Sequence, residues 1–165
     1  MKPLSPSDDV ALQAAQEWLK KGQHAEAAAE IQKVSAEQQH HPDVLEARWE
    51  AYAQAGNWAA ALEVSLTIRQ HLPEAEVGWL YQACSLDELN RLPEAFDVLV
   101  SAFEKFPAVP AIPYNLACCT CRLGRLKEAS SWLAQAAKVG GRAEVKLMAL
   151  GDDDLAPLLD EICAM

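Results

Sequence analysis

The sequence has no long apolar run and little positive charge, and both absences exclude classes of function. Apolar residues make up 51% of the chain, which is too high a share for a disordered protein. No apolar stretch approaches the ~18 residues that a membrane-spanning helix needs. Lysine and arginine number 14 against 24 aspartates and glutamates, so the net charge is −10. Nucleic acids and anionic membranes bind clustered positive charge, and we therefore expect neither as a partner.

A secretory signal and a disulfide pattern are also missing. The first residues, MKPLSPSDDVAL, lack the basic start and the continuous apolar segment of a signal peptide. The five cysteines are odd in number and irregular in spacing, which does not fit a disulfide framework and favours a reducing compartment. These features predict a soluble, acidic, cytoplasmic protein.

Sequence motifs that carry catalysis are absent. The chain contains no glycine-rich phosphate loop, no HExxH and no GxSxG. No nucleophile, base and metal-binding residue form a recognisable set either. We therefore predict no enzymatic activity, no cofactor and no metal site.

What the sequence does contain is a repeat of 34 residues. Steps of 34 connect a turn-forming column, Gly22, Gly56, Asn90 and Gly124. Five residues later, the same steps connect Ala27, Ala61, Ala95 and Ala129. Further columns contain Ala15, Trp49, Ala83 and Ala117, then Trp18, Tyr52, Leu86 and Thr120, and the pair Pro73 and Pro107. Four copies in register, without a gap, are far beyond chance.

Each copy predicts two helices joined by a tight turn. In the second copy, residues 43–55 contain no proline and place Leu45, Trp49 and Tyr52 three and four residues apart, as in an amphipathic helix. Glycine or asparagine then suits a helix end that needs a left-handed residue. A second helical run follows over residues 58–69, and Pro73 stops it. The alanine column falls where two helices would cross closely, because a larger side chain would separate them.

These features together resemble the tetratricopeptide repeat (TPR) family over residues 8–141. The Gly-x-Trp-x-x-Ala run at residues 56–61 carries the resemblance most clearly, whereas the first copy has Gln39 in place of a closing proline. A 35-residue RNA-reading repeat is the nearest alternative, and the period and the acidic charge oppose it. The resemblance implies an all-α, right-handed solenoid in one domain. Its repeats would cover about 8–41, 42–75, 76–109 and 110–141.

The pattern lapses after Gly140 and Gly141. Residues 142–150 predict one short helix, and the three aspartates from Asp152 onward supply N-caps for a last helix. That helix would carry Leu155, Leu158, Leu159 and Ile162 on one face. We expect residues 142–165 to form helices that cap the open end of the stack, as solenoids need.

The resemblance implies that the first helix of each repeat lines an inner, concave face. The family's inner-face positions fall in this chain on an acidic groove with an apolar and aromatic section. Our candidate binding residues are Glu46, Glu50, Leu80, Tyr81, Cys84, Asp87, Tyr114, Asn115, Cys118 and Arg122. Relatives that clamp the acidic tail of a chaperone use lysine, arginine and asparagine here, and this groove carries mainly carboxylates instead.

The composition of the groove predicts the chemistry of a ligand. We expect a protein or peptide segment with basic and apolar side chains, anchored on Tyr81 and Tyr114, because aromatic residues dominate interface energetics. The alternative, an ordinary solvated acidic face, stays open because the whole chain is acidic. The five tryptophans fall mainly in helix-packing columns, and Trp79 is the exception nearest the inner face.

The stretch YNLACCTCRLG, residues 114–124, contains three cysteines in four residues. Cys118 and Cys121 share one helix face, and Cys84 lies one period before Cys118. No CxxC knuckle or neighbouring histidine completes a zinc site, and a disulfide within a regular helix has poor geometry. We interpret these cysteines mainly as small packing residues. A redox or metal role for Cys84, Cys118 and Cys121 stays open.

We therefore predict a non-enzymatic scaffold that binds a protein or peptide segment in its concave groove. Two alternatives stay open. One is a structural subunit that self-associates into a homo-oligomer, which a concentration-dependent size would reveal. The other resembles the small TPR chaperones of bacterial secretion systems, which have a similar length and hold an extended segment of their partner.

Overall fold

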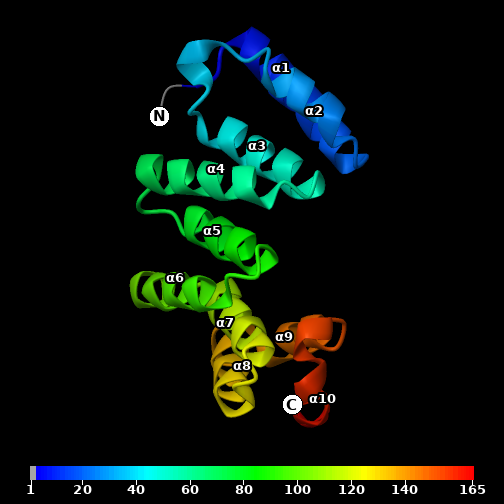
Figure 1. Ribbon diagram of the computed structural model, residues 1–165, viewed down its shortest axis with the longest axis vertical. Helices are drawn as coiled ribbons and strands as arrows, with labels where there is room; N and C mark the ends of the chain where they lie inside the picture. Colours follow the sequence, from blue (N-terminus) through cyan, green and yellow to red (C-terminus); the bar gives the residue numbers. More distant parts are fainter. Residues whose placement is uncertain (1–2) are drawn as a thin grey trace. The chain divides into compact units, whose positions relative to one another are not determined.

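The computed structural model describes residues 3–165 and shows an all-α chain, as predicted (Figure 1). That range contains ten α-helices, two 3-10 helices and no strand. The chain divides into two compact units. Unit 1 ends at Leu89 and unit 2 begins at Asn90, and each is described separately below.

Unit 1 is built from five α-helices that pack in chain order. They are α1 (Pro6–Lys20), α2 (His24–Ile31), α3 (Pro42–Gln54), α4 (Trp58–His71) and α5 (Val77–Glu88). A 3-10 helix, η1 (Ala36–Gln38), lies between α2 and α3. Each helix contacts the next, and α1 also contacts α3. Consecutive antiparallel hairpins of this kind bury one apolar stripe of each helix against its neighbours.

Unit 2 contains a second set of packed helices and the C-terminal segment. Its elements are α6 (Leu92–Lys105), α7 (Ala111–Arg122), α8 (Leu126–Gly140), α9 (Arg142–Ala149), the 3-10 helix η2 (Asp153–Leu158) and α10 (Leu159–Ala164). Helix α7 packs against α6 and α8, α9 packs against α8, and η2 packs against α7. Figure 1 shows α9 and α10, in orange and red, beside α7 and α8.

The turn-forming column has the left-handed backbone that the sequence predicts. The φ angles of Gly22, Gly56, Asn90 and Gly124 are 70°, 68°, 58° and 74°. At the second of these turns, the N–H of Gly56 donates to Ala53 at 3.0 Å and that of Asn57 to Tyr52 at 2.9 Å. These bonds satisfy carbonyls that the end of α3 would otherwise leave unpaired. The prediction of a left-handed residue after the first helix of each repeat is confirmed.

The alanine column is buried completely. Ala27, Ala61, Ala95 and Ala129 lie in α2, α4, α6 and α8, and each is 0% exposed. A methyl group lets two helices approach closely, whereas a longer side chain would need space that a close-packed interior does not have. The expectation that this column marks close helix packing is confirmed.

Asp8 fixes the start of unit 1. Its carboxylate accepts hydrogen bonds from the backbone N–H of Ser35 at 2.8 Å, the Ser35 hydroxyl at 2.8 Å and the Ser5 hydroxyl at 2.8 Å. The hydroxyl of Ser5 also accepts from the N–H of Asp8, which caps α1. Asp8 thereby joins the first turn of α1 to the loop that follows α2. These hydrogen bonds hold the pKa of the Asp8 carboxyl below its usual range.

We expect Asp8→Asn to destabilise the protein at neutral pH and to make little difference in strong acid. The pKa of Asp8 is lower in the folded chain than in the unfolded chain. Its contribution is therefore complete above the unfolded value of about 3.9 and is lost as the pH falls through the folded value. Urea unfolding of both proteins from pH 7 to pH 2 measures the difference. Asp9→Asn, one residue along on an exposed position, is the control. A difference that stays constant down to pH 2 would contradict this role.

Candidate binding surfaces

An aromatic stack includes Tyr81, one of the predicted inner-face residues of unit 1. The rings of Trp49 on α3 and Tyr81 on α5 are parallel within 2°, with their centroids 3.9 Å apart. The indole N–H of Trp49 donates to the hydroxyl of Ser85 at 3.1 Å, and Trp58 of α4 lies against the same indole at 6.4 Å between centroids. Trp49 occupies a repeat position that holds alanine in the other copies, so its ring fills the space between α3 and α5.

Two carboxylates of α3 stand beside this stack. Burial as the larger cause, together with the charges of Glu46 and Glu50, raises the pKa of Tyr81 to about 12. Burial and the neighbouring Asp43 raise the pKa of Glu46. Glu50 accepts a hydrogen bond from the side-chain amide of Gln54 at 3.1 Å. Within residues 3–165, neither Glu46 nor Glu50 forms an ion pair with a lysine or arginine.

The remaining candidates of unit 1 extend this surface along α5. Leu80, Cys84 and Asp87 are all half-buried. Burial, followed by the charges of Glu88 and Asp87, raises the pKa of the Cys84 thiol to about 11. Cys84 is therefore a neutral thiol at physiological pH, which makes it a poor nucleophile.

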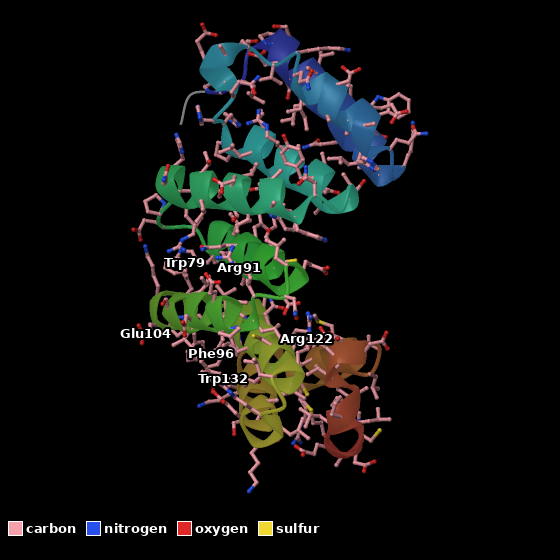
Figure 2. The ribbon with its side chains drawn as sticks, viewed as in Figure 1. Trp79, Arg91, Phe96, Glu104, Arg122 and Trp132 are labelled. Atoms are coloured by element: carbon pink, nitrogen blue, oxygen red, sulfur yellow. The ribbon has the colours of Figure 1, made fainter. Side chains whose placement is uncertain are left out.

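Trp79 takes part in packing within unit 1. The guanidinium carbon of Arg69 on α4 lies 3.4 Å from the centroid of the Trp79 ring, a cation–π contact. Trp79 is labelled in Figure 2. The ring is half-buried, and its indole nitrogen is buried without a hydrogen-bond partner.

In unit 2, the candidate residues of α7 are in contact with the C-terminal segment. Tyr114 is 7% exposed, and its hydroxyl donates to the carboxylate of Asp152 at 2.8 Å. The thiol of Cys118 donates to the same carboxylate oxygen at 3.6 Å. Burial first, and then the charge of Asp152, raises the pKa of Cys118; burial and the hydrogen bond to Asp152 raise that of Tyr114.

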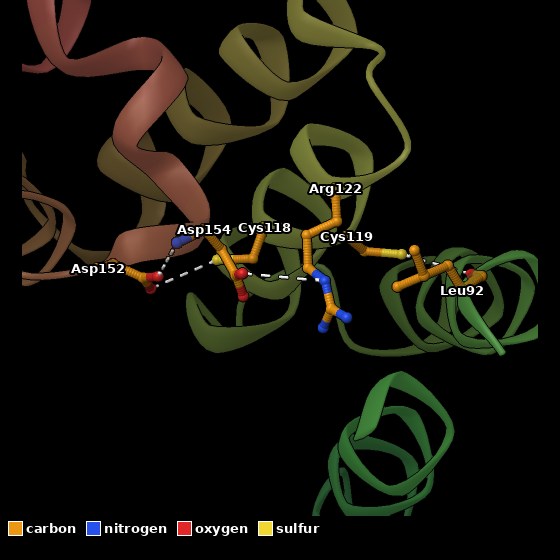
Figure 3. Close-up of polar contacts among 6 residues, drawn as sticks. All are labelled: Leu92, Cys118, Cys119, Arg122, Asp152 and Asp154. Carbon is orange, nitrogen blue, oxygen red and sulfur yellow. Dashed lines mark hydrogen bonds and ion pairs between the residues drawn. The ribbon is translucent and has the colours of Figure 1, made fainter. Parts of the chain in front are cut away.

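A second carboxylate of the segment meets the end of α7. The Nε of Arg122 lies 3.8 Å from a carboxylate oxygen of Asp154. Figure 3 shows this ion pair beside the Cys118–Asp152 bond. Asn115 is half-buried on the same helix, and Cys121 is buried in the apolar cluster beneath. The structure therefore brings Tyr114, Cys118 and Arg122 together around two aspartates.

Apolar side chains complete the attachment of the segment. Leu155, Leu158 and Ile162 are at most 2% exposed and pack in one cluster with residues of α7, α8 and α9. Asp152 also caps η2, because its other carboxylate oxygen accepts from the N–H of Asp154 at 3.1 Å. The sequence indicates the cap and three members of the apolar stripe. The prediction is wrong for Leu159, which is 48% exposed because a 3-10 helix ends at Leu158 and α10 begins at Leu159. The contact with Tyr114 is not indicated by the sequence.

Neither a metal cluster nor a membrane span is found in the range described. Among residues 3–165, no three histidine, cysteine, aspartate or glutamate side chains are placed to hold a metal ion. No helix in that range is long and apolar enough to cross a bilayer. All five cysteines are free thiols; Cys119 and Cys121 are buried and Cys163 is exposed.

Known proteins resemble this chain in structure and not in sequence. No protein-family model matches the chain, and no curated protein matches its sequence. Among solved structures, a thermophilic TPR protein of Thermus thermophilus, TTC0263, has a TM-score of 0.70 at 17% identity, covering 95% of each chain. A MamA structure from Desulfovibrio magneticus RS-1, residues 41 to the end, has a TM-score of 0.72 at 16% identity and covers 98% of this chain and 94% of its own.

A further MamA structure, from MSR-1, has a TM-score of 0.67 at 19% identity, covering 82% of this chain and 78% of its own. Likeness at such low identity shows a shared fold and nothing about ligands. The chain has the TPR fold, as its 34-residue period predicts.

Proposed function

We propose that this protein is a non-enzymatic interaction scaffold, and that the surface around Tyr81 in unit 1 binds a protein segment carrying basic and apolar side chains. The TPR fold supports the general role, since stacked helical repeats create extended surfaces suited to binding another chain. The finer proposal depends on the chemistry of the surface itself.

The observation that carries this proposal is a pair of carboxylates without a cation beside an aromatic ring. Glu46 and Glu50 lie close enough to Tyr81 to raise its pKa, and no lysine or arginine among residues 3–165 pairs with either. A lysine or arginine of a ligand would meet two carboxylates and an aromatic face together. An apolar neighbour in the ligand would contact Leu80 and the exposed part of Tyr81.

We expect charge reversal of these carboxylates to weaken the binding of cationic segments. The probe is a fluorescent peptide of alternating lysine and leucine, titrated into the wild type and the Glu46→Lys, Glu50→Lys variant. Loss of close charge pairs predicts a Kd higher by about tenfold or more. The difference should shrink as salt rises from about 50 to about 300 mM, because these charges are partly exposed to solvent. Fluorescence anisotropy measures both effects.

The Glu26→Lys, Glu63→Lys variant is the matched control, because it makes the same change of four charges at exposed positions of α2 and α4. A peptide of glutamate and leucine tests whether the surface selects charge. Equal affinity of the lysine peptide for the wild type and the double variant would refute the proposed ligand chemistry. Sedimentation of the free protein over a range of concentrations separates this role from self-association.

A further inference from the structure

The C-terminal segment forms hydrogen bonds and an ion pair with α7 of the kind that a bound peptide would form. Residues 152–164 are joined to α9 through Gly151 and contribute two short helices of six residues each. Asp152 accepts from Tyr114 at 2.8 Å and from Cys118 at 3.6 Å, and Asp154 pairs with Arg122 at 3.8 Å. The three receiving side chains belong to the inner-face positions where the TPR resemblance predicts a ligand.

The same segment borders an open pocket of unit 2. This pocket of about 340 Å³ is open to solvent and is lined in part by Leu133, Ala137, Glu161 and Met165. Leu159 of the segment is 48% exposed. Six-residue helices have little stability of their own, so their helical state depends on the surface that receives them. The contacts to be exchanged are the buried side chains of Leu155, Leu158 and Ile162, the bonds of the two aspartates, and the bond from Lys146 to the carbonyl of Cys163 at 2.7 Å. An equivalent segment from another molecule could replace each of them, and the glycine before the segment lets the chain turn away.

We propose that residues 152–164 are a displaceable occupant of the inner face of α7, and that this face binds a segment of the same chemistry from another molecule. The occupant defines that chemistry. Its contact residues are two aspartates, Asp152 and Asp154, followed by the apolar residues Leu155, Leu158 and Ile162. The surface and the ligand both differ from those of the proposed function, so either proposal can fail without the other.

The tether explains why an outside ligand would bind the wild-type chain weakly. A segment attached through a short linker competes at an effective concentration in the millimolar range. A free segment must exceed that competition before it occupies the face. A substitution that weakens the contact of residues 152–164 with α7, and leaves the side chains of α7 intact, should therefore strengthen the binding of a free peptide.

A synthetic peptide of residues 151–165, with Cys163→Ser and a fluorescent label, tests this prediction on the full chain. We expect Asp152→Ala in the protein to tighten peptide binding by about tenfold or more, because a hydrogen-bonded carboxylate is lost from the competitor. Asp153→Ala is the matched control: it removes the same charge from the exposed residue between the two anchors and should bind as the wild type does. A peptide lacking the carboxylate that corresponds to Asp152 should bind about tenfold more weakly.

A measurement on the wild type keeps the test independent of how well a variant folds. Hydrogen exchange followed by mass spectrometry should show residues 159–164 of the protein exchanging several-fold faster when unlabelled peptide is in excess, with α7 and α8 unchanged. Equal peptide affinity for the Asp152→Ala and Asp153→Ala proteins would overturn the proposal. The proposal would also be overturned if residues 159–164 exchanged their amide hydrogens as slowly as α7 does and if added peptide left that rate unchanged.

Discussion

Replacing Trp49 with alanine is expected to lower the free energy of unfolding by about 3 kcal/mol, the lower end of the cost of removing a large aromatic side chain from a core, because the Trp49 ring is half-buried. The indole stacks on Tyr81 at 3.9 Å, lies against Trp58 and donates to Ser85. Alanine would leave a cavity between α3, α4 and α5 and remove the donor to the Ser85 hydroxyl, which is 0% exposed and keeps its own bond to the carbonyl of Tyr81 at 2.8 Å. Urea unfolding followed by circular dichroism measures the loss.

The hydrogen bond and the ring contacts can be separated by a double-mutant cycle. Trp49→Phe keeps an aromatic ring against Tyr81 but removes the indole N–H, and Ser85→Ala removes the acceptor. We expect each single substitution to cost about 1–3 kcal/mol and the double variant to cost less than their sum, because either change alone already breaks the bond between Trp49 and Ser85.

Additive costs would show that the bond between Trp49 and Ser85 contributes nothing measurable. A cost of Trp49→Ala below about 1 kcal/mol, the range of ordinary substitutions, would contradict the view that this ring organises unit 1. The result also bears on the candidate binding surface. Tyr81 is positioned by its stack on Trp49, so the alanine variant should lose affinity for the lysine peptide as well.

The repeat period predicts the local geometry well because a single residue decides the conformation of each turn. A left-handed residue favours glycine or asparagine, and the sequence offers one of them at Gly22, Gly56, Asn90 and Gly124. Complete burial of the alanine column follows from the same period. In both cases the information is local or repeats at a fixed distance, so inspection of the sequence is enough.

The C-terminal contacts could not be predicted in the same way. Tyr114 and Asp152 are 38 residues apart, and nothing in the repeat pattern extends to residue 152. The run of three aspartates correctly indicates a cap for the next helix, but a cap uses one carboxylate oxygen and leaves the second without an assigned partner. The second oxygen accepts from Tyr114 and Cys118 only because the folded chain brings residue 152 next to α7.

The acidic surface of unit 1 illustrates a second limit of sequence reasoning. Counting charges cannot distinguish a solvated face from a binding surface, because the whole chain is acidic. The relevant fact is that Glu46 and Glu50 stand beside Tyr81 with no ion-pair partner among residues 3–165. This arrangement depends on Trp49, whose large ring replaces alanine at one repeat position and receives Tyr81. An aromatic residue in a column of small ones is the signal that could have indicated it.

The second large effect is expected at the alanine column, where Ala61→Leu should cost about 2–3 kcal/mol. Ala61 is 0% exposed in α4, so leucine would add three carbon atoms to a place with no free space. The helix itself would tolerate the change, because leucine and alanine have similar helix propensities. The cost would therefore report overpacking between helices, and urea unfolding with an unchanged m-value would measure it.

Ala59→Leu is the matched control, because it makes the same substitution two residues earlier at an exposed position of the same helix. We expect it to change the free energy of unfolding by no more than about 0.5 kcal/mol. Equal costs at the two positions would mean that the alanine column does not mark a steric limit. A large cost at Ala61 alone would mean that the repeat retains alanine there for its size, since helix propensity is matched between the two variants. The 34-residue period would then record, in four copies, how closely two helices must approach.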